Sequence, residues 1–282
     1  MATPQSSLRS AAAKAWDVWS QLATNIELQA VGVDVAGNRL RLRVAAADLP
    51  SAAAVAAEAA RQLSVSIEVR LAEDGSEEAC TSRDNCTSPM KAGIRIRQGS
   101  QYSTALCTMN FHIRIGSNEQ FLTAGHCGYS GSNDWYHIGY GANKVGSELA
   151  TLYQQNGQDA MRVEMPDAQA ADDIYSITSN IVGWRDPVQG EAICASLGNS
   201  NSIDCGTVSE DFHSWIGDSC GCTIWGANHD NISTIGGDSG SPISVGPGAP
   251  YPATGVGIHN RSNGDFARLD DVLDAFGAEL VL

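Results

Sequence analysis

The sequence has few basic residues, with 17 Lys and Arg against 32 Asp and Glu and a formal net charge of −15 at pH 7. Such a chain would repel nucleic acid and anionic membrane surfaces, so neither is an expected partner. No run of 18 apolar residues is present, which excludes a membrane-spanning helix. Residues Met1 to Arg9 also lack the apolar core of a signal peptide.

Cysteine is absent from the first 79 residues, and all eight cysteines lie at or after Cys80. An even number confined to one part of the chain favours a disulfide-bonded domain made for an oxidising compartment. Zinc is the competing interpretation, but Cys220-Gly-Cys222 is too tight for a zinc knuckle and no second pair follows at zinc spacing. We therefore expect no metal and no cofactor, and a secreted protein whose signal segment is not part of this chain.

The 282 residues are enough for two domains. Residues 1–78 read as a small α+β domain that ends in an acidic linker. Its elements are predicted from hydrophobic spacing and turn residues: a helix over 11–29, a hairpin of strands 31–35 and 40–44, a helix from Pro50 to Leu63 with Ser51 as N-cap, and a strand over 65–71. Residues 72–79 are polar, acidic and without periodicity, as expected for an exposed linker.

Residues 79–282 are of a different character. From Gly93 onward, short alternating segments are separated by Gly, Asn and Ser turns, a pattern typical of a β-barrel or sandwich. The clearest strands are predicted at 94–97, 109–115, 120–123 and 160–165. A single helix is expected at the end, over Leu269 to Phe276, with Leu273 and Phe276 packed on the body.

The segment Gly236-Gly-Asp-Ser239-Gly-Ser-Pro242 places one serine among small residues and an acid. A serine hydroxyl becomes a good nucleophile when a base takes its proton and donors await the oxyanion. Glycines let the backbone turn tightly, so that amide N–H groups can point at a reacting carbonyl. The segment resembles the nucleophile loop of chymotrypsin-like serine proteases.

A histidine suited to the role of base ends the predicted strand Phe121-Leu-Thr-Ala-Gly-His126-Cys127. A general base needs a fixed ring, with one nitrogen facing the nucleophile and the other held by an acceptor. Leu-Thr-Ala-Gly-His-Cys also resembles the segment that carries the catalytic histidine of the same family. Of the six histidines, His126 is the only one in a strand-to-Gly-Cys turn of this kind.

The third member is an acid that can hold the second imidazole nitrogen. Asp159 stands where a polar turn enters an apolar alternating strand, in a context that resembles the segment of the family's catalytic aspartate. Asp134 looks solvated, while Asp167 and the pair Asp172-Asp173 are further alternatives. The order His126, Asp159, Ser239 is that of chymotrypsin, not of subtilisin or the α/β-hydrolases.

The resemblance implies two packed antiparallel β-barrels and a monomeric serine endopeptidase that acts on protein or peptide substrates, with the Gly237 and Ser239 amides as oxyanion hole. It also implies that Asp238 pairs with an amine or amide, and that disulfides join Cys107 to Cys127 and Cys194 to Cys205. Cys80, Cys86, Cys220 and Cys222 are left, and local bridges are one way to pair them. The bacterial streptogrisin and α-lytic protease branch is the most similar, although its usual cysteine just before the nucleophile loop is missing.

Residues 1–78 are similar in element order to the pro-regions of that branch, which assist folding and cover the active site. The resemblance therefore implies a proenzyme whose N-terminal segment packs on the protease domain. A generic accessory domain is the alternative. A catalytically silent protease-fold binding protein is the alternative of a different class, although all three triad residues are present.

Two positions of the sequence bear on substrate preference. The family position that makes the pocket specific for basic residues is Ser233, which disfavours Arg and Lys. Gly-Ile-His259 resembles the strand on which staphylococcal glutamyl endopeptidases bind the acidic side chain, and Arg261 would add charge. We therefore expect cleavage after Glu, with large apolar residues as the alternative. The linker sequence Glu77-Glu78-Ala79 would then be a site of self-cleavage.

Overall fold

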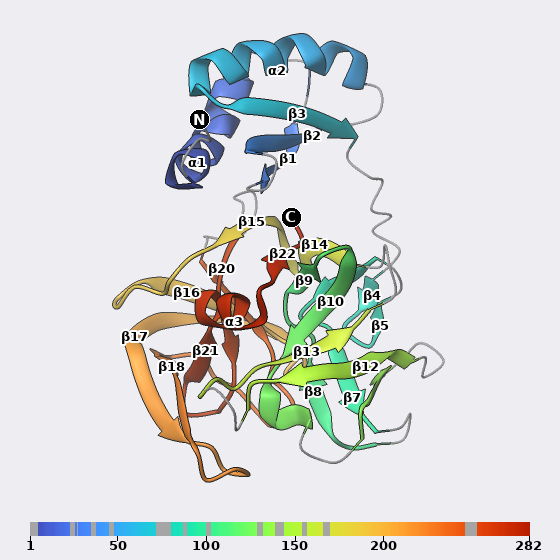
Figure 1. The fold of residues 1–282 in the computed structure, drawn as a ribbon, viewed down its shortest axis with the longest axis vertical. Coiled ribbons are helices and arrows are strands. Elements are labelled where there is room, and N and C mark those ends of the chain that lie inside the picture. Colours follow the sequence, from blue (N-terminus) through green and yellow to red (C-terminus); the bar gives the residue numbers. More distant parts are fainter. Residues whose placement is uncertain are drawn as a thin grey trace. The chain divides into compact units, whose positions relative to one another are not determined.

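The computed structural model forms two compact units, an N-terminal one and a C-terminal one (Figure 1). The residues that it describes are 5–22, 26, 28–34, 38–44, 48–71, 80–86, 89–99, 103–128, 132–138, 144–153, 157–165, 170–245 and 253–282. The predicted linker at 72–79, with the expected domain boundary, lies outside these residues. None of the described helices is long and apolar enough to span a bilayer.

The N-terminal unit consists of two helices and a three-stranded sheet. Its elements are α1 (Gln5–Leu22), β1 (Leu28–Asp34), β2 (Arg39–Val44), α2 (Leu49–Leu63) and β3 (Ser66–Leu71). Strands β1 and β2 form the predicted antiparallel hairpin. Strand β3 runs parallel to β2, because α2 connects the two strands and returns the chain to the end of the sheet at which β2 begins. The helix–hairpin–helix–strand order is therefore confirmed.

Two helix boundaries differ from the prediction. Helix α1 begins before residue 11 and ends at Leu22, and Leu28 already belongs to β1. The buried Trp19 indole donates a hydrogen bond to the Ile26 carbonyl, 2.9 Å away, which fixes the chain beyond the helix end. Ser51 is not the N-cap of α2. Its amide donates to the Asp48 carbonyl, and the helix starts ahead of Pro50, whose ring suits the first turn.

The C-terminal unit begins with a disulfide-closed hairpin, β4 (Cys80–Ser82) and β5 (Asn85–Cys86), followed by two large sheets. The first sheet has eight strands. In spatial order they are β22 (Glu279–Leu280), β9 (His112–Ile115), β10 (Asn118–Thr123), β13 (Met161–Glu164), β12 (Lys144–Thr151), β11 (Asp134–His137), β7 (Arg95–Gln98) and β8 (Leu106–Thr108).

The second sheet has nine strands and contains the long β17–β18 hairpin (Figure 1). In spatial order they are β19 (Pro242–Val245), β16 (Ala192–Leu197), β17 (Ser202–Ile216), β18 (Thr223–Asp230), β21 (Asp265–Arg268), β20 (Ala253–His259), β15 (Ile177–Trp184), β14 (Ala170–Ile174) and β6 (Met90–Ala92). Strand β14 pairs with β6 in parallel, whereas the pairings among β16 to β21 are antiparallel. Since β6 precedes the first sheet in the chain, this pairing ties the start of the unit to the second sheet.

Each large sheet has its own apolar core. Buried residues of the first include Ile94, Ile96, Met109, Phe121, Trp135 and Val163, and those of the second include Ile193, Leu197, Ile243, Val256 and Phe266. Helix α3 (Leu269–Phe276) has the predicted bounds and packs on β20 and β21. The predicted architecture, mainly β with two sheets, a short C-terminal helix and a small α+β unit in front, is confirmed.

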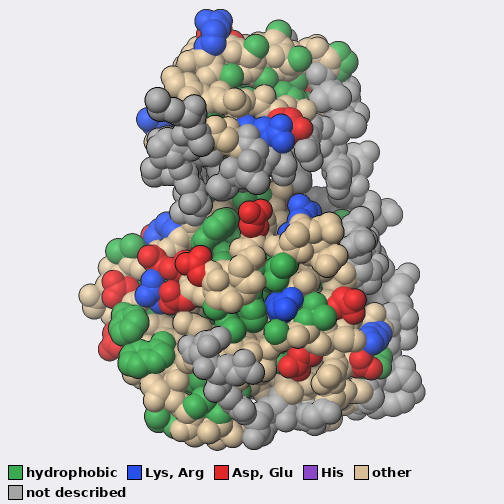
Figure 2. Space-filling model, viewed as in Figure 1, with side chains coloured by type: hydrophobic (Ala, Val, Ile, Leu, Met, Phe, Trp, Pro, Cys, Tyr) green, Lys and Arg blue, Asp and Glu red, His purple; other side chains and the backbone are tan. Residues whose placement is uncertain are grey.

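The acidic character of the C-terminal unit is visible at its surface. On the face shown in Figure 2, acidic, basic and hydrophobic side chains are interspersed, with several acidic ones close together. Within the described residues, no group of three or more His, Cys, Asp or Glu side chains has an arrangement that would hold a metal ion.

Candidate active site

His126 lies in a single turn of 3₁₀ helix, Gly125–Gly128, directly after β10. The turn is possible because position 125 is glycine: a Cβ there would approach the Tyr153 Cβ to 2.7 Å and the Ala160 backbone to 3.0 Å. The disulfide between Cys107 and Cys127 fixes the other side of the turn. The histidine ring is therefore held by its neighbours in the chain, with 28% of its side chain exposed.

Asp159 is the acid that the structure brings to His126. Its carboxylate accepts two hydrogen bonds from this residue, one from Nδ1 at 2.7 Å and one from the main-chain amide at 2.8 Å. The side chain is only 2% exposed, so water competes little for these bonds. Asn260, which is also buried, donates its amide N–H to the Asp159 carbonyl oxygen at 2.8 Å and so fixes the main chain there.

The alternative acids are occupied elsewhere or lie outside the description. Asp134 forms an ion pair with Lys144 at 2.7 Å and accepts a hydrogen bond from Ser147. Asp173 pairs with Lys91 at 3.1 Å. Asp167 lies outside the described residues. Asp159 is the acid that hydrogen-bonds to the His126 ring.

Ser239 lies on the opposite side of the ring. Its Oγ is 2.9 Å from His126 Nε2 and 3.0 Å from the main-chain oxygen of Asn260. The hydroxyl has one hydrogen, so it donates to one of these two acceptors at a time. The three side chains thus form a continuous hydrogen-bonded chain from Asp159 through His126 to Ser239.

The loop around Ser239 is fixed from below by a buried carboxylate. Asp238 is fully buried and accepts main-chain N–H groups of Asn199 and Ser200, each at 2.8 Å, and of Ile235 at 2.9 Å. The predicted pairing of this acid is thus with backbone amides. The Ser200 hydroxyl is a fourth donor to this carboxylate. These four hydrogen bonds stabilise the charge and fix the loop that carries Ser239.

Carbonyl groups of the same loop are held by Thr108 on β8. Its amide donates to the Ser239 carbonyl at 2.8 Å, and its hydroxyl donates to the Gly237 carbonyl at 3.0 Å. Gly237 has φ +97°, in the left-handed region that favours glycine. In the described part of the chain, neither the Gly237 nor the Ser239 amide donates to a protein acceptor. Both N–H groups are therefore available to a ligand.

The electrostatic setting of His126 favours its protonated form. Burial lowers the pKa of the ring, but the charge of Asp159 and the hydrogen bond to it raise the pKa by more. Asp218 adds to the increase and Arg261 opposes it, and the net result is a pKa above the ordinary value. A ring that attracts a proton in this way is suited to take one from a neighbouring hydroxyl.

A scan against protein-family models finds no match. Solved structures do match: a glutamic acid-specific serine protease described as using a histidine triad in substrate binding has a TM-score of 0.54, 21% identity, and coverage of 68% of this chain and 100% of its own. Thermobifida fusca protease A (0.52, 22%, 68% and 97%) and Nocardiopsis protease (0.52, 19%, 68% and 98%) are similar to the same extent. The fold is chymotrypsin-like.

This chymotrypsin-like fold places His259 behind the serine, at the end of β20. Its amide donates to the Ser241 carbonyl, and its carbonyl accepts the Gly240 amide. The ring is buried, and its Nδ1 lies 3.3 Å from Nε2 of His229 on β18. Burial, together with the neighbouring rings of His229 and His126, lowers the pKa of His259 to about 3. The ring is therefore neutral near pH 7.

Arg261 does not add the free positive charge that the sequence led us to expect at this site. Its guanidinium lies 3.1 Å from the Asp218 carboxylate and 3.6 Å from that of Asp265, so its charge is balanced by two acids. Two residues that the sequence reasoning missed are His229 and Thr234. The Thr234 hydroxyl is buried without a hydrogen-bond partner in the described structure. The sequence alone gives no signal for His229, because its proximity to His259 depends on the strand order. In the sheet, β21 lies between β18, which carries His229, and β20, which carries His259.

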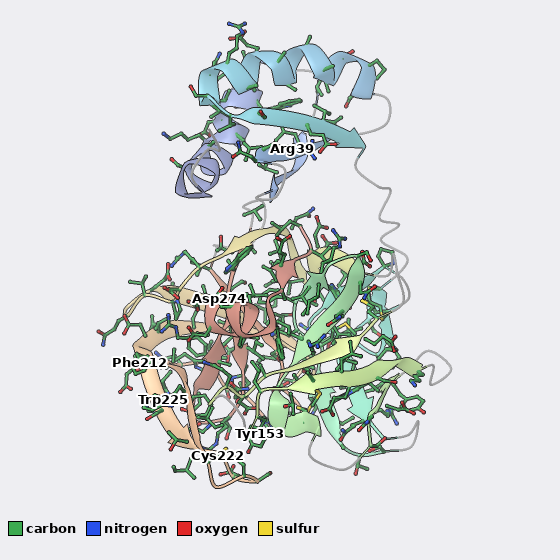
Figure 3. The ribbon with its side chains drawn as sticks, viewed as in Figure 1. Arg39, Tyr153, Phe212, Cys222, Trp225 and Asp274 are labelled. Atoms are coloured by element: carbon green, nitrogen blue, oxygen red, sulfur yellow. A yellow bond between two sulfur atoms is a disulfide. The ribbon has the colours of Figure 1, made fainter. Side chains whose placement is uncertain are left out.

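The tip of the β17–β18 hairpin lies beside the histidine turn. The Tyr153 ring contacts His126 edge-on, with centroids 6.2 Å apart, and its hydroxyl accepts the Ser219 amide at 3.3 Å. Figure 3 shows Tyr153 and Cys222 close together at this tip, where both belong to one apolar cluster with Trp215. The hairpin tip is thus part of the surroundings of the candidate site.

Four disulfides are present and none of the described cysteines is free. They join Cys80 to Cys86, Cys107 to Cys127, Cys194 to Cys205 and Cys220 to Cys222. The two pairs implied by the resemblance are present, and the other two are the local bridges. Together they are typical of a protein made for an oxidising compartment.

Proposed function

We propose that this protein is a secreted serine endopeptidase that hydrolyses peptide bonds through an acyl-enzyme. The observation that carries the proposal is the hydrogen-bonded chain Asp159–His126–Ser239 next to two amides, Gly237 and Ser239, that have no protein acceptor. The similarity to bacterial chymotrypsin-like proteases supports the reaction class, and the four disulfides support secretion.

In the proposed mechanism, Ser239 Oγ attacks the carbonyl carbon while its proton moves to His126 Nε2. Asp159 holds the Nδ1–H tautomer and stabilises the imidazolium. The Gly237 and Ser239 amides bind the oxyanion, an effect worth about 10²–10³ in kcat for each donor. His126 then gives the proton to the leaving amine. Water then attacks the acyl-enzyme while one of its protons moves to His126. When the second tetrahedral intermediate collapses, the acid is released and His126 returns the proton to Ser239 Oγ.

For specificity we propose cleavage after Glu. Although His259 is neutral before substrate binds, a neutral imidazole still donates one N–H. When His229 Nε2 holds the shared proton, His259 Nδ1 accepts it and His259 Nε2–H is left to donate to a carboxylate. One of the similar proteases is glutamic acid-specific and uses histidines in substrate binding, which supports the same role here.

We further propose that residues 1–78 act as a pro-region. Their helix–hairpin–helix–strand unit contains no disulfide among its described residues, and it precedes the acidic Glu77-Glu78-Ala79 segment. An enzyme that cuts after Glu would release this unit by itself. The same cleavage reaction would then act on protein substrates and activate the proenzyme.

A fluorophosphonate label tests the reaction class. We expect modification of Ser239, blocked by preincubation with a peptide aldehyde and absent in Ser239→Ala. Ser241→Ala, which removes a serine two residues away, is the matched control and should keep the label. Absence of labelling after cleavage of the linker would reject the enzyme and favour a protease-fold binding protein.

A further inference from the structure

The peptide bond between Gly236 and Gly237 carries one of the two candidate oxyanion donors. In a trans peptide the carbonyl and the N–H point in opposite directions, so the direction of the Gly236 carbonyl determines that of the Gly237 N–H. Glycine on both sides makes rotation of this peptide easy. A Cβ on Gly236 would meet nothing within 4 Å, so packing does not hold that residue. Another interaction must set the orientation.

Asn199 supplies that interaction. Its Nδ2 donates to the Gly236 carbonyl oxygen at 2.7 Å, so the Gly237 N–H of the same peptide points away from Asn199. Its Oδ1 accepts a hydrogen bond from Arg95 Nη1 at 2.9 Å. Because arginine only donates and a carbonyl only accepts, these two partners determine which end of the amide faces which group.

The position of Asn199 is itself determined by the start of the C-terminal unit. Asp84, in the loop closed by the Cys80–Cys86 disulfide, binds Arg95 through both carboxylate oxygens, with Nε donating to Oδ1 at 2.6 Å. This two-point contact fixes the plane of the guanidinium.

Arg83, in the same loop, is buried and holds the strands on either side of the turn that carries Asn199. It donates to Ser196 Oγ at 2.9 Å and to the Ser202 carbonyl at 3.0 Å. The amides of Asn199 and Ser200 bind Asp238, next to Ser239. The disulfide loop, this turn and the serine loop therefore form one connected network.

We propose that Asn199 is a positioning residue that locks the Gly236–Gly237 peptide with its N–H directed into the oxyanion hole, and that Asp84 and Arg95 act through it. The inference rests on the proposed function, since it assigns a role in that reaction. It adds a chain of residues, Asp84–Arg95–Asn199, that connects the segment following the linker to the reacting atoms.

The test is Asn199→Asp in the otherwise unchanged chain. The introduced carboxylate still accepts from Arg95, but it repels the Gly236 carbonyl and attracts the Gly237 N–H, which favours the flipped peptide. With a peptide p-nitroanilide we expect kcat to fall about 10²-fold, the lower end of the range for loss of one oxyanion donor, with KM nearly unchanged. The inhibition constant of a peptide aldehyde should rise by a similar factor, because its hemiacetal oxygen occupies the same hole.

Asn201→Asp is the matched control. It makes the same chemical change two residues away on an exposed side chain, in a left-handed conformation (φ 52°) that aspartate tolerates. It should keep wild-type kcat and aldehyde affinity. Thermal unfolding of both variants separates a positioning role from a loss of stability. Equal losses in the two variants, or wild-type kinetics of Asn199→Asp, would overturn the proposal.

Two further measurements examine the network and the peptide itself. Arg95→Lys should lower kcat several-fold alone and add little to Asn199→Ala, because residues that act through one another are not additive. Full additivity would remove Arg95 from the chain. The amide resonance of Gly237 should shift in Asn199→Asp but not in Asn201→Asp. This NMR measurement does not need an active protein, so it separates the two proposals. Failure of the fluorophosphonate to label Ser239 in the wild type would reject the proposed enzymatic function. An unchanged Gly237 resonance in Asn199→Asp would reject the role of Asn199 in orienting the peptide.

Discussion

Both carboxylate oxygens of Asp159 are bound by a single residue, His126, through its ring Nδ1 at 2.7 Å and its main-chain amide at 2.8 Å. The two bonds fix the ring relative to its own backbone as well as its tautomer. An amide in place of the carboxylate would keep one acceptor oxygen and present a donor to the other partner.

Asp159→Asn should therefore keep the fold and lose the reaction. We expect kcat to drop about 10⁴-fold, since the wrong tautomer of His126 leaves Nε2 protonated and unable to accept from Ser239. Steady-state hydrolysis of a peptide p-nitroanilide measures the loss. Asp134→Asn, at the exposed alternative acid, is the control and should behave as wild type.

The pH dependence of kcat/KM follows from the raised pKa of His126. The ring is a base only when neutral, so activity should increase with pH through a midpoint above the ordinary histidine value and fall on the acid side. Removing the negative charge with Asp159→Asn should move the residual acid limb to lower pH. A midpoint that stays in place in this variant would assign the titration to another group.

Specificity should depend on His259. His259→Ala should lower kcat/KM for substrates with Glu before the scissile bond about 10- to 100-fold, as for a lost hydrogen bond to a charged group. Substrates with Leu at that position should change less. His213→Ala removes a histidine of β17, a strand of the same sheet that is not adjacent to β20, and is the matched control. A peptide-library digest in which the wild type prefers Phe or Leu over Glu would refute the role given to His259.

Stability should fall in mild acid because several histidines are buried and neutral. Burial lowers the pKa of His112 and His229 to about 4 and that of His259 to about 3. The unfolded chain then binds more protons than the folded one below the ordinary pKa, about 6.5, so the contribution is full above that value and is lost as the pH falls. His126, with its raised pKa, acts in the opposite sense only above that value.

Each such group should cost about 1.4 kcal/mol per pH unit in this range. Urea unfolding of Ser239→Ala, which cannot digest itself, measures the effect between pH 7 and pH 5. His112→Asn, which removes one of the groups, should flatten the curve. A free energy of unfolding that is constant over the range would contradict the neutral state of these rings.

Self-cleavage should occur in the linker. The wild-type chain is expected to mature to an N-terminus at Ala79 or close to it, whereas Ser239→Ala should remain at full length. N-terminal sequencing and intact mass measure the product. Glu77→Gln combined with Glu78→Gln should slow the processing if the enzyme cuts after Glu, and unchanged processing would assign the cut to another site or another protease.

Short local patterns were enough to predict the candidate triad. His126 and Ser239 stand in turns whose glycines and neighbours are specific to their positions, and Asp159 stands at the entry of a strand. Helix α3 was predicted with its observed bounds from the spacing of its apolar residues, and the structure ends it at Gly277 in a left-handed conformation. These features need only the residues next to them in sequence.

The parts that were missed depend on contacts between distant segments. His229 meets His259 across 30 residues, and Arg95 reaches Asn199 across 104. Burial leaves the His259 ring neutral, and two acids balance the charge of Arg261. No periodicity contains this information, since it arises only when the second sheet folds and β6 pairs with β14.

The disulfide between Cys107 and Cys127 joins the residue next to Thr108 to the residue next to His126. Thr108 binds the loop of Ser239 through its amide and its hydroxyl. The disulfide therefore connects the histidine turn covalently to the strand that holds this loop. The distance between the His126 ring and the Ser239 hydroxyl therefore depends directly on how the two sheets are aligned. A small slip between the sheets would inactivate the site while the fluorescence of Trp135, in the core of the first sheet, still reported a folded protein.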